Sequence, residues 1–403
     1  MSDRSDAYIR KQKAAARDAE LQDKWSKIES LYQKKLWHQL TELLVESLRD
    51  GSFGNLDTKE LYDSFITDFE HRINTLQMAM MCIPIAHDLF AKDPEAAFEF
   101  LKRRERVCKK DKAARIRLLT GEIELKLKIR DVNGNLSDPV EVRRLIESTQ
   151  DALDDVSGVT PVHAPFYKAS AQYLKDTRNH AGYYREALRY LGCEDPDKLE
   201  ESEKVDQAVL LGFAALLGEN VYNFGELLAH PILTSLKNSS EYSWLYDVLL
   251  AFNSGDIPKF KSLQKKWGAW PDLKSSEDLI MDKIRLLCIM EMSTARPSKE
   301  RYLGFDEIAR KTQVAEKQVE FIIMRALSKN LINGTINQVE RTVAVTWVQP
   351  RVLSLDQIGA MRERITKWNN DVTAMGKVVE ENAKEILIIG KAKENKEVVV
   401  AEA

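Results

Sequence analysis

The C-terminal part of the chain carries inward-facing positions at alternating steps of three and four residues. These positions are Ile358, Met361, Ile365, Trp368, Val372, Met375, Val379, Asn382 and Ile386. Strict alternation of this kind is typical of the a/d seam of a coiled coil or helical bundle, whereas an ordinary globular helix has a broader apolar face. A helix from Leu355 to Ile388 would be roughly 50 Å long, at about 1.5 Å per residue. A module of about 80 residues has a radius of gyration of only about 12 Å, so we expect partner chains to cover this seam.

Upstream, from Asp23 to Trp267, the apolar pattern predicts one helix after another, separated by short breaks. Runs such as Leu61, Phe65 and Phe69 recur with the period of a helix. Paired helices with short turns over about 240 residues are typical of an α-solenoid of the tetratricopeptide type, although no clean repeat period can be aligned. We therefore expect a mainly α fold, with a right-handed solenoid of helical repeats at its N-terminal side.

The segment before the seam helix has a different pattern. A helix with Leu279, Ile284 and Leu287 is followed by predicted helices at Gly304–Thr312 and Glu316–Asn330. Two short alternating segments, Leu331–Ile336 and Thr342–Trp347, then predict strands. Three helices followed by a hairpin make a winged helix.

The turn of this hairpin can be placed at two positions. Asn333–Gly334 is a common hairpin dipeptide, but Asn337–Arg341 leaves two strands of matched length, and we prefer it. The second strand then offers an edge that could extend a sheet across subunits. The predicted interface residues on it are Thr342, Val343, Val345 and Trp347.

These patterns divide the chain into five parts. We expect a charged, frayed leader over residues 1–22 and the repeat solenoid over 23–270. The winged-helix part follows over 271–350 and the bundle helix over 351–389. A disordered tail is expected over 390–403.

Composition limits the classes of function. The 403 residues include 60 basic and 63 acidic side chains, and the resulting net charge of −3 gives no global attraction to nucleic acid or membrane. No apolar stretch approaches the roughly 18–20 residues of a spanning helix, and the N-terminus lacks the apolar core of a secretory signal. The four cysteines are widely scattered, as in reduced proteins of the cytoplasm and nucleus.

Motifs of known catalytic or cofactor chemistry are absent from the sequence. The six histidines form no H-x-H or H-E-x-x-H pair, so the sequence contains no motif of a zinc protease or isopeptidase site. Neither a P-loop, a G-x-G-x-x-G nor a G-x-S-x-G motif occurs. We therefore expect no enzyme, and we name no catalytic, cofactor-binding or metal-binding residue.

Two features bear on nucleic-acid binding. The third helix of the winged helix carries three basic side chains against two acidic ones, which suits phosphate neutralisation poorly and favours protein contact. The strip Lys102–Arg117, in contrast, carries nine basic side chains against two acidic ones. It is either a solvated corner between two helices or a docking site for an acidic partner or RNA.

Four stretches carry a resemblance to a known family. They are His230–Pro231, Leu250–Gly255, Lys283–Cys288 and Trp347–Leu353. Together with the order of helical repeats, winged helix and terminal helix, they closely resemble a PCI-domain subunit of the proteasome lid. The resemblance covers roughly Glu20 to Leu387, and it leaves the charged leader and the tail beyond Ile389 outside.

The resemblance implies a non-catalytic scaffold that supports ubiquitin-dependent protein degradation and proteasome assembly. Its winged helix would join other PCI subunits, and its terminal helix would enter a helical bundle of the hetero-oligomeric lid. Implied neighbours include the MPN-domain deubiquitinase pair and a ubiquitin receptor subunit. The alternative is a PCI subunit of the signalosome, of a translation initiation complex or of a messenger-export complex, with nucleic-acid contacts.

Overall fold

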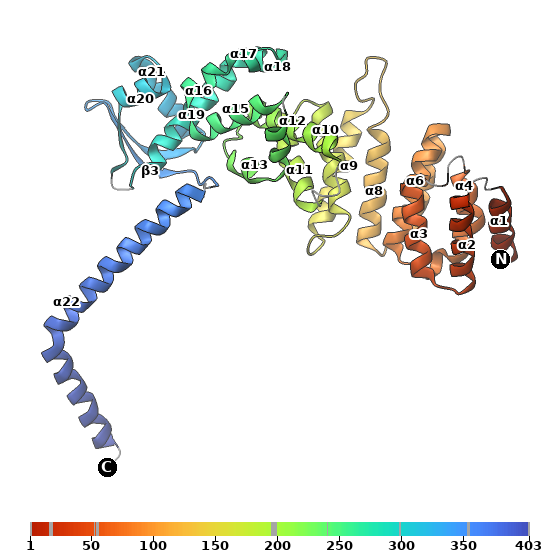
Figure 1. Cartoon of the computed structure of the whole chain (residues 1–403), viewed down its shortest axis with the longest axis horizontal. Helices are drawn as coiled ribbons and strands as arrows, with labels where there is room; N and C mark the ends of the chain where they lie inside the picture. The colour runs from red at the N-terminus through yellow and green to blue at the C-terminus, as the bar shows by residue number, and fades with distance from the viewer. Residues whose placement is uncertain are drawn as a thin grey trace. The chain divides into compact units, whose positions relative to one another are not determined.

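The computed structural model describes residues 2–15, 19–51, 53, 56–194, 200–239, 241–297, 300–352 and 355–401 (Figure 1). Side chains are described for these residues except 2–4, 15, 355–357, 382 and 384–401. The chain divides into two compact units. The repeat unit comprises Met1–Tyr222, His230–Phe252 and Asp256–Arg285, and the C-terminal unit comprises Asn223–Ala229, Asn253–Gly255 and Leu286–Ala403.

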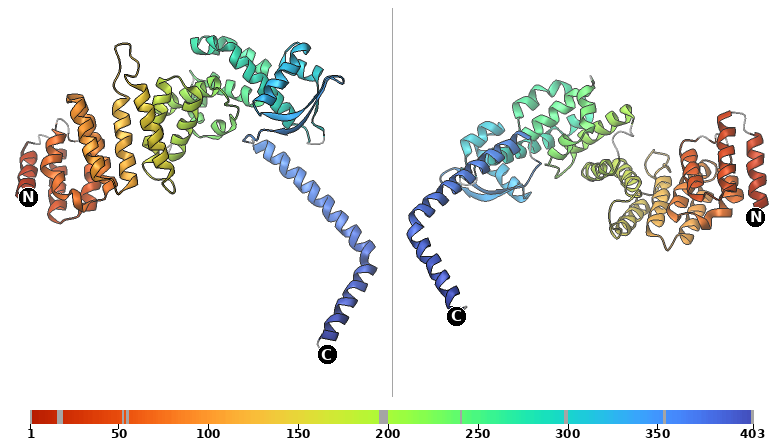
Figure 2. Two further views of the ribbon diagram at one scale, coloured as in Figure 1. Left: turned by 180° about the vertical axis from the view of Figure 1, so that it is seen from behind. Right: turned by 60° about the horizontal axis from the view of Figure 1, so that its bottom comes forward.

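The repeat unit is built from helices, and helices close in sequence lie side by side (Figures 1 and 2). Its first half contains α1 (Ser2–Ala15), α2 (Ala19–Gln33), α3 (Trp37–Arg49), α4 (Thr58–Leu61), a π-helical turn (Tyr62–Ile66), α5 (Thr67–Phe69), a 3-10 turn (Glu70–Arg72), α6 (Thr75–Lys92), α7 (Pro94–Val107) and α8 (Lys112–Lys126). Then follow α9 (Pro139–Asp154), α10 (His163–Asp176), α11 (His180–Cys193), α12 (Glu201–Leu217), α14 (Ile232–Asn238), α15 (Ser243–Ser254), α16 (Ile257–Ser262), α17 (Gln264–Trp267) and α18 (Pro271–Ser275). The predicted mainly α fold is confirmed, and the right-handed solenoid stays a prediction.

Short polar side chains set where several of these helices begin. Asp93 accepts hydrogen bonds from the backbone amides of Glu95 and Ala96 at the start of α7, and Asp111 does the same at the start of α8. Such caps satisfy amides that have no partner inside the helix. The turns are therefore fixed by local chemistry.

Helix α8 shows how one repeat packs on the next. Its Ala114, Leu118 and Leu125 belong to the core shared with α1–α7. Its Ile116 and Ile123 belong to a second core shared with α9 and α10. A helix that is apolar on two faces must be covered on both sides, so α8 joins two successive layers of the solenoid.

The leader differs from our expectation. We expected residues 1–22 to fray, but α1 forms and the side chains of Tyr8 and Ile9 are buried. The ring of Tyr8 meets that of Trp25 edge-on, with centroids 6.4 Å apart. The two apolar side chains gain enough burial to order a helix in which six of the other twelve residues are charged.

The buried side chain of Lys283 closes the C-terminal end of α12. Its Nζ donates hydrogen bonds to the carbonyl oxygens of Ala215 at 2.6 Å and Gly218 at 2.8 Å. The last carbonyl groups of a helix lack intrahelical partners and carry partial negative charge. The ammonium group therefore satisfies both the hydrogen-bonding and the electrostatic requirement of this helix end.

The C-terminal unit contains a winged helix. α19 (Glu277–Thr294) contributes residues to both units and is followed by β1 (Tyr302–Gly304), α20 (Phe305–Thr312), α21 (Glu316–Ser328), β2 (Ile332–Asn337) and β3 (Thr342–Val348). α13 (Gly225–Ala229) also belongs to this unit. The sheet is antiparallel with strand order β1-β3-β2.

The preferred hairpin turn is confirmed. Asn337 pairs with Thr342, so the chain turns between these two residues. Asn333 and Gly334 instead lie inside β2, opposite a bulge in β3: Asn333 pairs with Trp347 and Gly334 with Val345, so Thr346 is the extra residue. A Cβ at position 334 would lie 2.2 Å from the carbonyl oxygen of Ala344, so glycine permits the close approach of the two strands.

The prediction that Thr342–Trp347 is an edge strand is wrong. β3 lies between β1 and β2, and β1 pairs with it from Thr342 to Ala344. The side chains of Val343 and Val345 are buried inside the unit. β1 has only three residues, which is too short for an alternating pattern to reveal it in the sequence.

The terminal helix α22 runs from Leu355 to Ala401. Its 47 residues correspond to about 70 Å of helix. We expected the bundle helix to end at residue 389 and a disordered tail to follow over 390–403. The helical backbone of α22 instead continues beyond residue 389 to Ala401.

The role of Lys283 leads to a stability prediction. In Lys283→Met the aliphatic stem is kept, but the carbonyl groups at the end of α12 lose their donor. We expect a loss of about 2–3 kcal/mol in the free energy of unfolding, because buried acceptors are left unpaired. Urea denaturation followed by circular dichroism measures it. The control Lys274→Met replaces an exposed lysine, and an equal effect of both substitutions would contradict this role.

Candidate interaction surfaces

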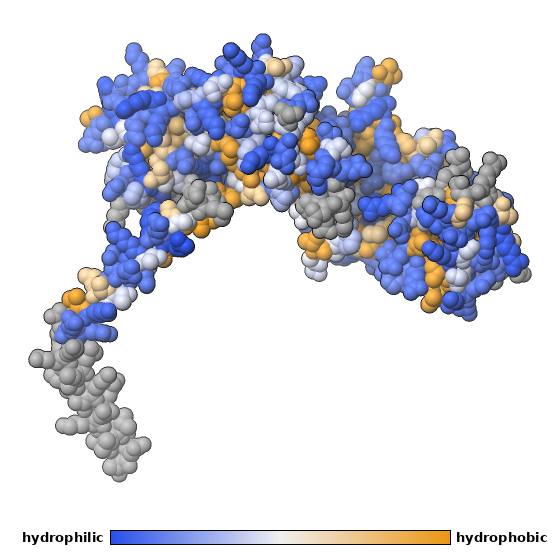
Figure 3. All heavy atoms as spheres, viewed as in Figure 1, coloured by the Kyte–Doolittle hydropathy of each residue, from blue (hydrophilic) through white to orange (hydrophobic). Residues whose placement is uncertain are grey.

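The predicted seam of α22 is exposed along its described length. The side chains of Ile358, Met361, Ile365, Trp368, Val372, Met375 and Val379 are between 46% and 71% exposed. Figure 3 shows apolar side chains on this part of α22 among hydrophilic ones. The side chains of Asn382 and Ile386 lie outside the described residues. Seven large apolar side chains in one row, without cover inside the described chain, form a candidate partner surface.

The segment that leads into α22 is held by Arg351. Its guanidinium Nη1 donates a hydrogen bond to the carbonyl oxygen of Asn253 at 3.2 Å, and Nη2 forms an ion pair with Glu291. The Arg351 side chain is buried to about nine-tenths. A charged group in this position is stable because both its charge and its hydrogen-bonding directions are matched.

Glycines allow the backbone to pack closely around this anchor. Gly255 has a φ of +65°, and a Cβ there would lie 2.6 Å from the Cα of Cys288. At Gly225 a Cβ would lie 2.8 Å from the carbonyl oxygen of Val352. Only glycine fits these positions without displacing neighbouring backbone.

Parts of three stretches that carry the family resemblance therefore meet at one place. Asn253 and Gly255 belong to Leu250–Gly255, Cys288 belongs to Lys283–Cys288, and Arg351 belongs to Trp347–Leu353. We define this place as the α22 anchor. The sequence placed Trp347–Leu353 among the stretches that carry the resemblance but did not reveal the role of Arg351, because its partners are far away in the chain.

β1 and β2 are the two outer strands of the sheet, and β2 is the longer one. In the described part of the chain, β2 pairs with β3 on one side only. The main-chain groups on its other side can accept a further strand. Of the residues predicted as a wing edge, Thr342 and Val343 pair with β1 as well as with β2, so they cannot receive another strand.

Five of the nine basic side chains in the strip Lys102–Arg117 form ion pairs with acidic side chains of the same chain. The guanidinium of Arg104 pairs with Glu70 at 3.0 Å and stacks over the ring of Tyr62. Further ion pairs join Arg103 to Glu99, Lys112 to Asp155, Arg115 to Glu105 and Arg117 to Glu124. The exposed remainder comprises Lys102, Arg106, Lys109 and Lys110. This distribution favours the solvated corner over a docking site.

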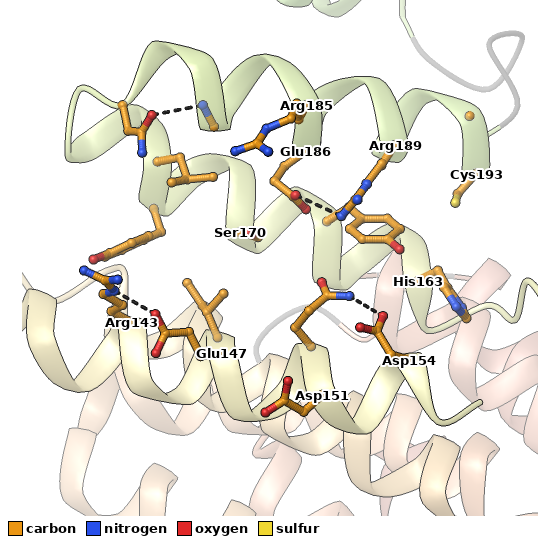
Figure 4. A pocket seen from close by; sticks show the side chains of 18 of the residues that line it. Arg143, Glu147, Asp151, Asp154, His163, Ser170, Arg185, Glu186, Arg189 and Cys193 are labelled. Carbon is orange, nitrogen blue, oxygen red and sulfur yellow. Dashed lines mark hydrogen bonds and ion pairs between the residues drawn. The ribbon is translucent and has the colours of Figure 1, made fainter. Parts of the chain in front are cut away.

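A groove of about 1070 Å³ lies between α9 and the pair α10–α11 (Figure 4). Among its titratable groups, Oε1 of Glu186 pairs with Arg189 at 3.1 Å while its buried Oε2 has no hydrogen-bond partner in the residues described, and the Nδ1 atom of His163 lies 2.9 Å from the hydroxyl of Thr160. Burial raises the pKa of the Cys193 thiol, which disfavours the reactive thiolate. The groove thus brings no activated nucleophile together with a base among its lining residues.

The residues that the structure describes contain no group of three or more His, Cys, Asp or Glu side chains arranged to hold a metal ion. None of their helices has the length and apolar character that crossing a bilayer requires.

Three protein families match consecutive parts of the chain. The family described as PSD13 N-terminal repeats matches residues 24–249, and the PCI domain matches residues 260–347. The family described as Rpn9 C-terminal helix matches residues 351–383. The matched regions correspond to the helical repeats, the winged helix and the first part of α22.

Individual relatives cover nearly the whole chain. The 26S proteasome non-ATPase regulatory subunit 13 homolog B of Arabidopsis thaliana is 37% identical over 91% of this chain and 94% of the relative. The 26S proteasome regulatory subunit RPN9 of Saccharomyces cerevisiae is 32% identical over 92% and 95%. A translation relative, eukaryotic translation initiation factor 3 subunit M of Dictyostelium discoideum, is 25% identical over only 46% of each chain.

The α22 anchor leads to a second prediction. In Arg351→Met, Glu291 loses its partner in a partly buried position, and we expect a local loss of about 2–3 kcal/mol. Hydrogen exchange at the backbone amides of Gln349 and Val352, which are bonded to Leu331 and Asn223, should become at least tenfold faster.

The matched control is Arg341→Met. Arg341 pairs with Glu316 at 2.7 Å on the surface, where an ion pair contributes at most about 1 kcal/mol. Unchanged exchange at Gln349 and Val352 in Arg351→Met would refute the anchor.

Proposed function

The chain belongs to the family of 26S proteasome regulatory subunit 13, also named RPN9, and we propose that it is a non-catalytic scaffold subunit of the lid of the regulatory particle. In this role it supports ubiquitin-dependent protein degradation through contacts with other subunits. The single observation that carries the proposal is the uncovered a/d seam of α22 in a chain whose relatives are regulatory proteasome subunits.

The energetics of the seam support the proposal of a partner. Burying one large apolar side chain contributes about 1.5–3 kcal/mol before the cost of ordering is subtracted. Seven such side chains in the row Ile358 to Val379 give a strong driving force for insertion into a helical bundle. Its narrow a/d geometry favours helices as neighbours over a flat surface.

The second contact that we propose uses the edge of β2. A strand from a neighbouring PCI subunit would pair with the free main-chain groups of Ile332–Asn337. The proposal thereby moves the wing contact from β3 to β2. The anchor at Arg351 supports both contacts, because it fastens the segment that joins β3 to α22.

The partners in this proposal are other PCI subunits of the lid, the MPN-domain deubiquitinase pair and a ubiquitin receptor subunit. They would together form a hetero-oligomer of the cytoplasm and nucleus. Charge supports protein partners over nucleic acid, because α21 is nearly neutral and most of the strip Lys102–Arg117 is paired internally. Because a translation factor subunit matches part of the chain, a translation complex is the alternative that the experiment must distinguish from the proteasome lid.

A seam variant tests the proposal. Ile365→Asp combined with Val372→Asp places two charges in the row that partners must cover. We expect the tagged variant to be lost from the native complex, because each carboxylate would have to be desolvated without a partner. Native purification followed by quantitative mass spectrometry of the co-purified subunits measures incorporation.

The matched control is Thr366→Asp combined with Thr373→Asp. These positions have the same seven-residue spacing on the same helix but lie beside the seam, and both are exposed. The control should assemble normally. Full incorporation of the seam variant would contradict the bundle role. Co-purification with translation factor or signalosome subunits in place of proteasome subunits would show that the chain belongs to a different complex from the one proposed.

A third measurement concerns catalysis. The purified chain is expected to leave ubiquitin chains intact over the time in which an active deubiquitinase cleaves them fully. Robust cleavage that persists after removal of contaminating proteases would overturn the non-catalytic role.

A further inference from the structure

The outward face of α21 carries large apolar side chains that the winged-helix core does not use. Val319, Ile323 and Ala326 are buried against the rest of the unit. On the opposite side, Phe321 is 67% exposed and Met324 is 43% exposed. The two lie three residues apart, so their side chains are neighbours on one helix face.

The wing fixes the charges around this pair. Its tip reaches back to α21, where Arg341 pairs with Glu316 at 2.7 Å and Gln338 donates a hydrogen bond to Glu320 at 3.2 Å. Both acidic side chains of α21 are thus engaged by the wing. Arg341 offsets the charge of Glu316, whereas the neutral amide of Gln338 leaves Glu320 charged, so Lys317 and Arg325 against Glu320 give this face a net charge of 2 − 1 = +1.

Two basic side chains flank the apolar pair at regular spacing. Lys317 precedes Phe321 by four residues and Arg325 follows it by four, and both are exposed. Lys317, Phe321 and Arg325 therefore form one line along the helix, with Met324 beside it. The line is about 12 Å long.

We propose that this face of α21 docks an amphipathic helix of a partner protein that presents an apolar row with acidic side chains one turn before and one turn after it. The apolar row would cover Phe321 and Met324, and the acidic side chains would face Lys317 and Arg325. Aromatic and methionine side chains surrounded by charges are typical of helix recognition at protein interfaces.

Duplex DNA fits this face less well. A helix that reads the major groove contacts base edges mainly through hydrogen-bonding side chains, and phosphate contacts require a clear basic excess. Here the centre of the face is Phe321 and Met324. The proposed surface goes beyond the lid contacts proposed above, because it uses neither the seam of α22 nor the edge of β2.

Fluorescence anisotropy tests the proposal with defined probes. The protein is the full chain carrying Ile365→Asp and Val372→Asp, so that the α22 seam does not capture apolar peptides. The first probe is a labelled 20-residue helical peptide with leucines at i, i+3, i+4 and i+7 and glutamates one turn outside them. The second has lysines in place of these glutamates, and the third is a labelled 20-base-pair DNA duplex.

We expect saturable binding of the glutamate peptide and at least tenfold weaker binding of the lysine peptide. Phe321→Ala combined with Met324→Ala should weaken the binding of the glutamate peptide at least tenfold. Lys317→Glu combined with Arg325→Glu should reverse the preference between the two peptides. Because all four side chains are exposed, these variants should keep the urea midpoint of the parent, and the charge variant carries the test if the apolar variant fails to fold.

The matched control is Tyr302→Ala. Tyr302 is also an exposed aromatic residue, but it lies on β1, at the sheet edge opposite β2, whereas α21 packs next to β2. It should leave binding unchanged. Absence of binding, equal binding of both peptides, or a loss in Tyr302→Ala as large as in the Phe321 and Met324 variant would overturn the proposal. Tighter binding of DNA that depends on Lys317 and Arg325 would overturn it in favour of nucleic acid.

Discussion

The apolar row of α22 is the constraint on which the rest of the structure depends. A helix of 47 residues is too long to be covered by the winged helix beside it in sequence, and its seam follows the narrow spacing that only other helices match. Water exposure of seven large apolar side chains is costly, and no part of the described chain covers them. We therefore propose that the molecule presents this helix to partners and gains stability when they cover it.

The C-terminal unit gives that helix a firm base. Arg351 joins the segment before α22 to the carbonyl oxygen of Asn253 and to Glu291, while Gly255 lets two backbone segments approach closely. Residues that are far apart in sequence thus hold one short segment in place. The repeat unit is stabilised differently, through layers such as the two faces of α8 and through caps such as Asp93 and Asp111. Neither the α22 anchor nor the layers and caps of the repeat unit depend on a catalytic group.

Features that depend on local spacing could be predicted from the sequence. The seam from Ile358 to Val379 and the helical repeats follow from periodicity, and the hairpin turn after Asn337 follows from the matched lengths of the two strands. Features that depend on distant pairing could not be predicted. β1 is too short to show a pattern, so β3 was mistaken for an edge, and Tyr8 and Ile9 looked like part of a charged leader because their cover comes from elsewhere in the fold. The role of Arg351 was hidden for the same reason.

The central claim is that α22 becomes buried by partner helices. Hydrogen exchange of the α22 backbone, measured on the free chain and on the same chain inside the native complex, tests it most directly. The account predicts that the amides from Ile358 to Val379 exchange at least a hundredfold more slowly in the complex, because a packed helix opens far less often than an isolated one. Equal exchange in both states would show that no partner covers this helix and would contradict the account.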